Sequence, residues 1–530
     1  MRILSIYPNA DGNGRIPTGL AIIMTVLKNA GYEIELFDTT FFHGTSRDND
    51  KREEAKLVKK VESFYGPDID TAYGLEIIDG KPSIVYDSFS TEKINALLLE
   101  KLKKLNPSVV IISLIEDNYK WADSLLGIVK DYNSSIKVIV GGPTPSAAPE
   151  IIIENPQIDF LIQGEGEEAI VDLCDSLKNG DDNFPSIQNL WYKVNGQVRS
   201  NPLRPFINMD TVPIQDMEMW DRRHFYKPYD GGMYMTGHFE MSRGCPNQCT
   251  YCVNHTIRRR LKTAGKYFRR KSPRVAIEEI KYHKEKYDLR RIVFCDDNFL
   301  LMPKSQFGEW AEEFKSLWLS EINLPYWIAT TVDSINRDTL QLLKDTGCGG
   351  VGLGIEAGGE WFRKNILKRY YTNEFIKNAF DLLHEYDIRT TGNVMIGFPG
   401  ETEEDIFETI KVMRIIKPRS FSLALVTPYV GTDLHRVVVE LGLIDVSDKP
   451  GFRGMSTDVS FRQHSTIGNT NISPERFREL YDGFIDYVSG KLQIPDKYNS
   501  DVLKGDETFK TRSKESLVVA DVIKKVSEEN

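Results

Sequence analysis

The chain has 530 residues, of which 41% are hydrophobic and 27% charged, and its formal net charge is −10. The length suits several domains, the composition is ordinary for a soluble globular protein, and the negative charge argues against a nucleic-acid partner. No apolar run approaches the roughly 18 residues of a membrane span, the N-terminal run is too short for a signal peptide, and the few scattered cysteines suit free thiols in the cytoplasm.

Residues 1–180 alternate short apolar segments with amphipathic ones, which predicts a doubly wound, Rossmann-like α/β domain. The predicted strands are almost wholly apolar, as expected for parallel strands that are covered on both faces. They span 2–7, 33–37, 109–113, 137–140 and 160–162, and helices are expected over 20–30 and, at the surface, 48–65. Ligands of such domains bind at the carboxyl ends of the strands.

The pattern breaks between 181 and 230. Asn195-Gly196 predicts a hairpin turn, and three prolines follow within eighteen residues, at 202, 205 and 213. This stretch is interpreted as a linker.

Residues 242–252 hold three of the six cysteines, Cys245, Cys249 and Cys252, spaced C-x3-C-x2-C. A cubic 4Fe–4S cluster normally takes four cysteines, one per iron. The next cysteine, Cys295, lies 43 residues further on, so one iron would stay open for a non-protein ligand. Structural zinc, which usually shows two C-x2-C pairs or a Cys/His set, and a disulfide are the alternatives.

A second β/α alternation covers 231–440, and it has six units, too few for a full eight-stranded barrel. The strands are expected over 239–242, 291–295, 326–330, 351–355, 391–396 and 421–425, separated by helices that include 275–286, 339–345, 373–386 and 403–416. Residues 441–530 are polar and expected to be mainly helical.

Polar residues follow several of these strands at the end where a βα barrel builds its site. Asp296-Asp297 follow the second strand, Glu356 caps the fourth, and Gly397-Phe-Pro399-Gly-Glu401 ends the fifth. Taken singly, the aspartates could cap a helix, Glu356 could be structural, and 397–401 could be only a tight turn. Residues 258–274 hold nine basic residues, typical of a solvated loop or of a rim that attracts an anion, and they receive no specific role.

Together these segments resemble the radical S-adenosylmethionine (SAM) enzymes, whose barrel is a partial (βα)6 TIM-like barrel. Tyr251, just before the third cysteine, belongs to the same signature. The resemblance implies a 4Fe–4S cluster on Cys245, Cys249 and Cys252. It also implies SAM contacts from residues at the strand ends, namely Tyr251, Asp296, Asp297, Glu356, Gly397 and Pro399.

The N-terminal domain resembles the cobalamin-binding domains found in one subgroup of these enzymes. The matching positions are Thr18 and Gly19 before the first helix, Ser113 and Leu114 after one strand, Gly141 and Gly142 after the next, and Gly164 and Glu165. The segment 9–15 has no histidine, which implies that imidazole does not hold the lower face of the cobalt. A Rossmann-like domain that binds another ligand, or none, is the alternative.

The resemblance implies a radical SAM methyltransferase that uses a 5′-deoxyadenosyl radical and methylcobalamin. It would methylate an unactivated carbon, or a phosphinate phosphorus, of a small-molecule, lipid or peptide substrate, with flavodoxin or ferredoxin as electron donor. A cobalamin-dependent radical cyclase or ring-rearranging oxidoreductase and a non-catalytic corrinoid sensor or carrier are the rivals. A methylthiotransferase is disfavoured because the N-terminal domain has only Cys174. Substrate and oligomeric state stay open.

Overall fold

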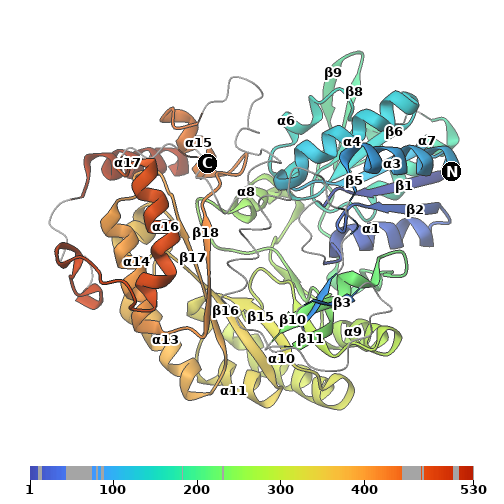
Figure 1. Ribbon diagram of the computed structural model, residues 1–530. Coiled ribbons are helices and arrows are strands. Elements are labelled where there is room, and N and C mark those ends of the chain that lie inside the picture. The colour runs from blue at the N-terminus through green and yellow to red at the C-terminus, as the bar shows by residue number, and fades with distance from the viewer. Residues whose placement is uncertain are drawn as a thin grey trace.

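Alternating apolar side chains of the N-terminal strands pack into two separate layers of helices. Ile3, Ile111 and Ile139 face the helices α1 (Thr18–Asn29) and α7 (Ala169–Asn179), whereas Leu4 and Val110 face α3 (Thr91–Leu105) and α4 (Tyr119–Tyr132). The computed structural model describes residues 1–9, 15–42, 75–78, 81–84, 87, 89–181, 183–229, 232–444, 467, 471–504 and 512–528. Figure 1 shows this three-layer domain beside a larger β/α body.

The first sheet has the strand order β2-β1-β5-β6-β7-β8-β9. The strands from β2 to β7 run parallel, and β8 and β9 add an antiparallel hairpin at the edge. The strand order reverses between β1 and β5, which is the position where doubly wound sheets bind their ligands. The strands are β1 (Arg2–Tyr7), β2 (Glu33–Asp38), β5 (Val109–Ser113), β6 (Lys137–Gly141), β7 (Phe160–Ile162), β8 (Leu190–Val194) and β9 (Gln197–Ser200); the main helices are α1 (Thr18–Asn29), α3 (Thr91–Leu105), α4 (Tyr119–Tyr132) and α7 (Ala169–Asn179).

The second sheet has the order β10-β11-β14-β15-β16-β17-β18, and its last six strands run parallel. Within the described residues β18 pairs with no strand that would close the sheet, so the predicted partial barrel is confirmed. The strands are β10 (Tyr226–Tyr229), β11 (Gly232–Phe239), β14 (Arg291–Phe294), β15 (Tyr326–Thr330), β16 (Cys348–Glu356), β17 (Thr390–Ile396) and β18 (Ser420–Leu425); the outer helices are α9 (Pro273–Tyr287), α10 (Lys304–Leu317), α11 (Arg337–Asp345), α12 (Glu360–Asn365), α13 (Asn373–Glu385), α14 (Glu403–Ile416) and α15 (Asp433–Glu440).

Two expectations about the elements need correction. The first barrel strand is β11, which ends at Phe239, whereas the sequence suggested 239–242. Thr236, Gly237 and His238 interrupt its apolar pattern, which hid the strand. The stretch 181–230, interpreted as a linker, contributes β8 and β9 to the first sheet and β10 to the second. The helix expected over 48–65 lies outside the described residues.

The C-terminal region is helical where it is described, as expected. α16 (Pro474–Val488) buries Leu480 and Phe484 in the main core, and α17 (Lys514–Glu528) packs Val519 and Ile523 against a cluster that includes Phe398. Figure 1 shows both helices against the β17–β18 side of the barrel.

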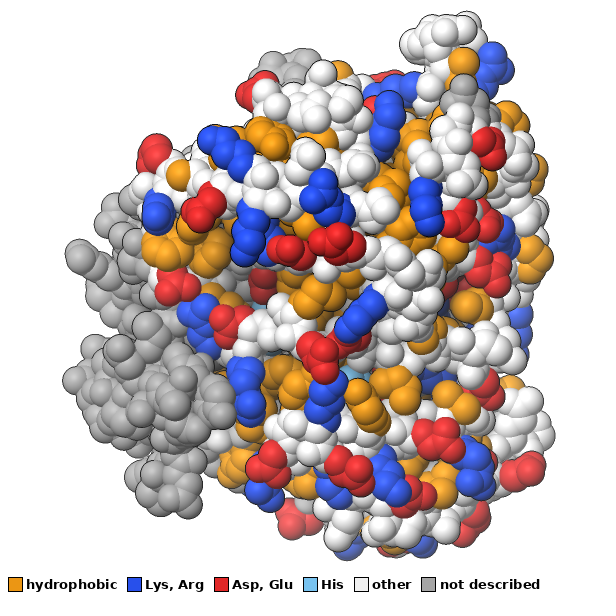
Figure 2. Space-filling view, turned by 90° about the vertical axis from the view of Figure 1, so that its right-hand side faces the viewer, with side chains coloured by type: hydrophobic (Ala, Val, Ile, Leu, Met, Phe, Trp, Pro, Cys, Tyr) orange, Lys and Arg blue, Asp and Glu red, His pale blue; other side chains and the backbone are white. Residues whose placement is uncertain are grey.

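The surface carries mixed charge. On the face seen in Figure 2, acidic and basic side chains are interspersed and form no large field of one sign. A search of the described helices finds none that combines the length and hydropathy needed to span a bilayer.

Candidate functional site

The three motif cysteines lie on a loop between a short strand and a helix. β12 (Ser242–Arg243), which pairs with β13 (Arg269–Arg270), leads into the loop, and α8 (Val253–Arg260) follows it. The chain turns at Gly244, where φ is +86° and a Cβ would lie 2.7 Å from the ring of Tyr267. Glycine is therefore needed at this position, and it lets the loop pass close to the aromatic ring.

All six cysteines of the chain are free thiols, which removes the disulfide alternative. Burial raises the pKa of Cys245 to about 11 and that of Cys252 to about 12, so a bound metal must displace their protons. The three thiols stand on one short loop, and in a cubane each would bind a different iron. The donor set therefore fits a cluster that keeps its fourth iron open.

Arg369 connects the cysteine loop to the end of β16. Its guanidinium is buried, and Nη1 lies 3.7 Å from Cys249 Sγ, 3.3 Å from the Tyr251 hydroxyl and 3.7 Å from Glu356 Oε1. Nη2 donates a 2.7 Å hydrogen bond to the Gly354 carbonyl. One buried cation thus brings three of the predicted site residues together.

Glu356 occupies an unusual backbone conformation at the end of its strand. Its φ is +68°, in the left-handed region that non-glycine residues rarely adopt, and the strand pairing is irregular there. Burial raises the pKa of the carboxyl, although Arg369 opposes the shift. Strain of this kind is common at binding sites.

The two adjacent aspartates face different ways. Asp296 is buried and accepts hydrogen bonds from the Met241 N–H at 3.0 Å and from the Ser242 hydroxyl, and burial raises its pKa to about 6. It holds the chain that enters the cysteine loop. Asp297 accepts a 2.8 Å hydrogen bond from Asn254 and lines a large cavity between the domains.

The turn after β17, residues 397–401, is held by hydrogen bonds within it. Glu401 Oε2 accepts hydrogen bonds from the backbone N–H groups of Gly397 at 2.5 Å and Phe398 at 3.2 Å. The Phe398 ring lies 6.1 Å from that of Tyr251, so the turn, which includes the buried Pro399, borders the cysteine loop. From the C-terminal region, Ser516 donates to the Gly400 carbonyl at 2.6 Å.

A cavity of about 550 Å³ lies between the N-terminal domain and the barrel. Seven of the eight residues predicted to bind cobalamin line it; they are Thr18, Gly19, Ser113, Gly141, Gly142, Gly164 and Glu165. The eighth, Leu114, packs in the core, and its N–H donates to the Gly141 carbonyl at 2.8 Å. The barrel contributes Asp297 and Cys295 to the opposite wall.

The ends of β5 and β6 form a cradle at this cavity. Gly142 has φ +107°, and a Cβ there would lie 2.8 Å from Ser113 Oγ and 2.9 Å from the Leu114 carbonyl. Gly142 therefore lets the ends of β5 and β6 pack closely, and Ser113, Gly141 and Gly142 line the cavity beside them. A wall of glycines and one small hydroxyl leaves room for a bulky cofactor such as cobalamin.

Glu165 links the two domains across the cavity. It accepts hydrogen bonds from Arg243 at 3.0 Å, from Arg269 at 2.6 Å and from the Ile207 N–H at 2.9 Å. Burial alone would raise its pKa, but the two guanidinium groups hold it below the usual value. The carboxylate expected to contact a cofactor therefore also joins the first domain to the cysteine loop.

Sequence reasoning missed Arg369 and Arg243. Neither arginine belongs to a sequence motif with a recognisable spacing. Arg369 stands in an ordinary Leu-Lys-Arg-Tyr run, and Arg243 stands beside the cysteines without an assigned role. Both became recognisable only when the fold brought buried carboxylates to them.

Comparison with known proteins finds two matching domain families and several relatives. The Radical SAM superfamily model matches residues 239–413, and the B12 binding domain model matches residues 84–174. An uncharacterized methyltransferase of Pyrococcus horikoshii is 29% identical over 395 residues, covering 73% of this chain and 82% of the relative. The anaerobic magnesium-protoporphyrin IX monomethyl ester cyclase of Rubrivivax gelatinosus is 26% identical over 369 residues, covering 68% and 63%.

The fold also matches a solved structure. The radical SAM methyltransferase TsrM from Kitasatospora setae, with cobalamin and a 4Fe–4S cluster bound, superimposes with a TM-score of 0.62 at 15% identity, covering 100% of this chain and 99% of that one. At this identity the likeness concerns the fold. Together with the two matched domains, it confirms the predicted architecture and the predicted cofactors: 4Fe–4S cluster, SAM and cobalamin.

Proposed function

Because the chain is a radical SAM enzyme with a B12-binding domain, we propose that it is a methyltransferase that acts on an unactivated carbon, or a phosphinate phosphorus, of its substrate. The observation that carries the proposal is the cavity of about 550 Å³, in which the glycine cradle of the first domain faces the cysteine-loop side of the barrel. When bound, the cluster and SAM supply a carbon-centred radical and cobalamin supplies a transferable methyl group, while the protein supplies placement and electrostatics.

In this proposal the cysteines at 245, 249 and 252 hold the cluster and leave one iron for SAM. Arg369, buried beside Cys249 and Glu356, provides a fixed positive charge for carboxylate or thiolate groups there. Asp297 and Asn254, hydrogen-bonded at 2.8 Å, lie between the cysteine loop and the cavity. These two side chains would orient a ligand that reaches from the cysteine loop into the cavity.

The methyl-transfer assignment is supported by the Pyrococcus horikoshii relative, which is named as a methyltransferase. The alignment with it covers most of both chains. The cyclase relative favours a second candidate, a radical reaction that forms or rearranges a ring without methyl transfer. Both candidates use the same cofactors, so only the product distinguishes them. The reductant is proposed to be a flavodoxin or a ferredoxin, and the substrate a small molecule, lipid or peptide.

Anoxic reconstitution with iron, sulfide and cobalamin, followed by incubation with SAM, reductant and an extract of metabolites, tests the proposal. With SAM labelled in its methyl group, we expect a product that has gained one labelled methyl. A new product without label would support the cyclase. Release of no 5′-deoxyadenosine would favour a non-catalytic corrinoid protein.

A further inference from the structure

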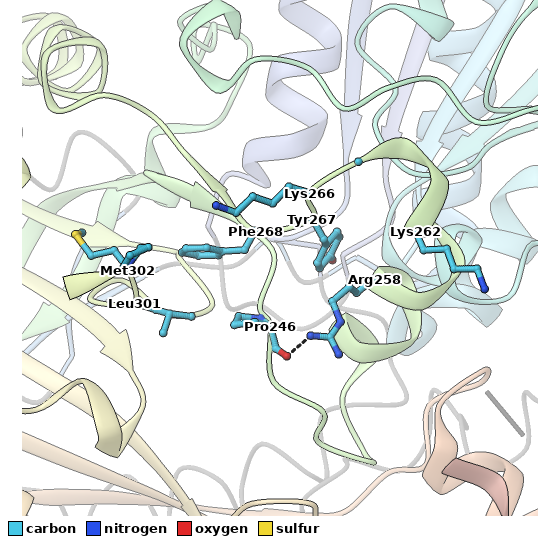
Figure 3. A pocket seen from close by; sticks show the side chains of 10 residues that line it. Pro246, Arg258, Lys262, Lys266, Tyr267, Phe268, Leu301 and Met302 are labelled. Carbon is cyan, nitrogen blue, oxygen red and sulfur yellow. Dashed lines mark hydrogen bonds between the residues drawn. The ribbon is translucent and has the colours of Figure 1, made fainter. Parts of the chain in front are cut away.

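A second hollow, of about 540 Å³, lies beside the cysteine loop, on the outer side of Tyr267. Figure 3 shows the apolar Phe268, Leu301 and Met302 on one side of it and the basic Arg258 and Lys262 on the other. Lys266 reaches over the hollow from the segment after α8. Apolar and basic side chains therefore line one concave surface.

The cations of this hollow differ from their neighbours in the basic run 258–274. Five of the nine basic residues pair with carboxylates, namely Arg259, Arg260, Arg269, Lys271 and Arg274. Arg270 donates to the carbonyls of Phe299 and Leu301. Within the described part of the chain, the other three, Arg258, Lys262 and Lys266, have no carboxylate within 4.0 Å, and all three line the hollow.

The hollow adjoins the proposed reaction site. Pro246, which follows the first cysteine directly, forms part of its wall, and Arg258 donates a hydrogen bond to the Pro246 carbonyl. Tyr267 lines both this hollow and the cavity between the domains. Tyr267, whose hydroxyl donates a 2.9 Å hydrogen bond to Asn254, is therefore a wall that the hollow and the cavity share.

We propose that this hollow binds the anionic end of the substrate, a carboxylate or phosphate carried on an apolar or aromatic body; this rests on the proposed function. The exposed Lys262 and Lys266, which have no carboxylate within 4.0 Å among the residues that the structure describes, attract the anion, and the apolar wall of Phe268, Leu301 and Met302 contacts the body. The concave shape and the apolar wall favour a small molecule over a docked acidic protein.

The test measures binding of naphthylacetate, its neutral analogue naphthylacetamide and inorganic phosphate to the full chain by saturation-transfer NMR and calorimetry. Lys262→Gln/Lys266→Gln is the test variant; Arg258 stays intact because it binds the cysteine loop. Lys103→Gln/Lys104→Gln, which removes the same charge from exposed lysines on α3, is the control. We expect the test variant to bind naphthylacetate about five- to tenfold more weakly, while the control variant matches the unchanged protein.

Equal affinity for naphthylacetate and naphthylacetamide, or an unchanged affinity in the test variant, would overturn the proposal. A test variant that binds naphthylacetate normally, but whose reconstituted cluster is reduced by flavodoxin more slowly than the cluster of the unchanged protein, would also overturn it, since the cations would then serve a protein partner. Failure here is separate from failure of the proposed function, because probe binding is measured without SAM, cluster or turnover.

Discussion

At the scale of single residues, the site depends on one buried guanidinium. Arg369 contacts groups from the cysteine loop and from β16, two segments that are more than 100 residues apart in the chain. Removing one partner of a buried ion pair leaves the other charge buried without a counter-charge. This lowers the stability of the fold more than the loss of an exposed ion pair does.

Arg369→Gln therefore tests whether the guanidinium organises the site. We expect it to lower the free energy of unfolding by about 3 kcal/mol, because the buried Glu356 carboxylate loses its cation, and to weaken SAM binding about tenfold. Denaturant unfolding and equilibrium SAM binding measure the two effects. Arg337→Gln, which removes an arginine from an exposed pair with Glu385, is the control and should change neither quantity appreciably. Equal behaviour of the two variants would contradict this role.

At the scale of elements, the strand ends carry the cofactor-binding geometry. The β5 and β6 ends approach each other so closely that Gly142 can carry no side chain without displacing backbone. Both the positive φ of Gly142 and the close contacts around it require glycine at this position. A substitution there is therefore expected to disturb the local fold and the cavity wall together.

Gly142→Ala tests the cradle. The added Cβ would meet Ser113 Oγ and the Leu114 carbonyl below 3.0 Å, and we expect a stability loss of about 2 kcal/mol together with an affinity for cobalamin lowered about tenfold. Gly180→Ala is the matched control, since Gly180 also has a positive φ, +69°, but no atom lies within 4 Å of its added Cβ. That variant should be strained yet bind cobalamin normally. If both variants kept cobalamin equally well, the cradle would not be the binding surface.

Elements with a strong period were predictable, and those that depend on partners were not. β5 and α14 were expected within a residue of where they lie, because apolar runs and amphipathic periods are local properties. β11 was misplaced because its mixed side chains become strand only through pairing with β10 and β14. The motif cysteines needed no structure for their recognition, whereas Arg369 did, since burial and long-range contact leave no trace in local sequence.

At the scale of the whole molecule, buried hydrogen bonds and ion pairs join the two α/β bodies. Glu116, in the loop after β5, accepts a hydrogen bond of 2.6 Å from the Val430 N–H, which follows β18. Burial raises the pKa of Glu116 to about 8. The folded protein therefore holds a proton on this carboxyl that the unfolded chain releases at a lower pH.

This proton gives a pH dependence of defined sign. Because the folded pKa lies above the unfolded value, the native state binds more protons between about pH 4.5 and about pH 8, and the free energy of unfolding falls as pH rises through that window. We expect Glu116→Gln, which keeps an acceptor for the Val430 N–H, to remove roughly 4 kcal/mol of this decline. Denaturant unfolding at several pH values measures it. Equal slopes for the variant and the unchanged protein would contradict the buried, protonated state.

The two-domain organisation was predictable from the sequence, and the interface was not. The βα alternation changes character near residue 230, but nothing local signals that Glu165 would meet Arg243 and Arg269, or that Glu116 would meet the β18 loop. These contacts join segments whose separation in the chain ranges from 78 to 314 residues. They are set by how two independently patterned domains fit together.

The proposed chemistry depends on three cysteines that hold a 4Fe–4S cluster and leave one iron open to SAM. Electron paramagnetic resonance of the anoxically reconstituted, reduced protein, recorded with and without SAM, shows whether they do. We expect a cubane signal that changes when SAM is added and that is absent in Cys249→Ala. A signal indifferent to SAM, or a Cys249→Ala variant with an unaltered spectrum, would contradict it.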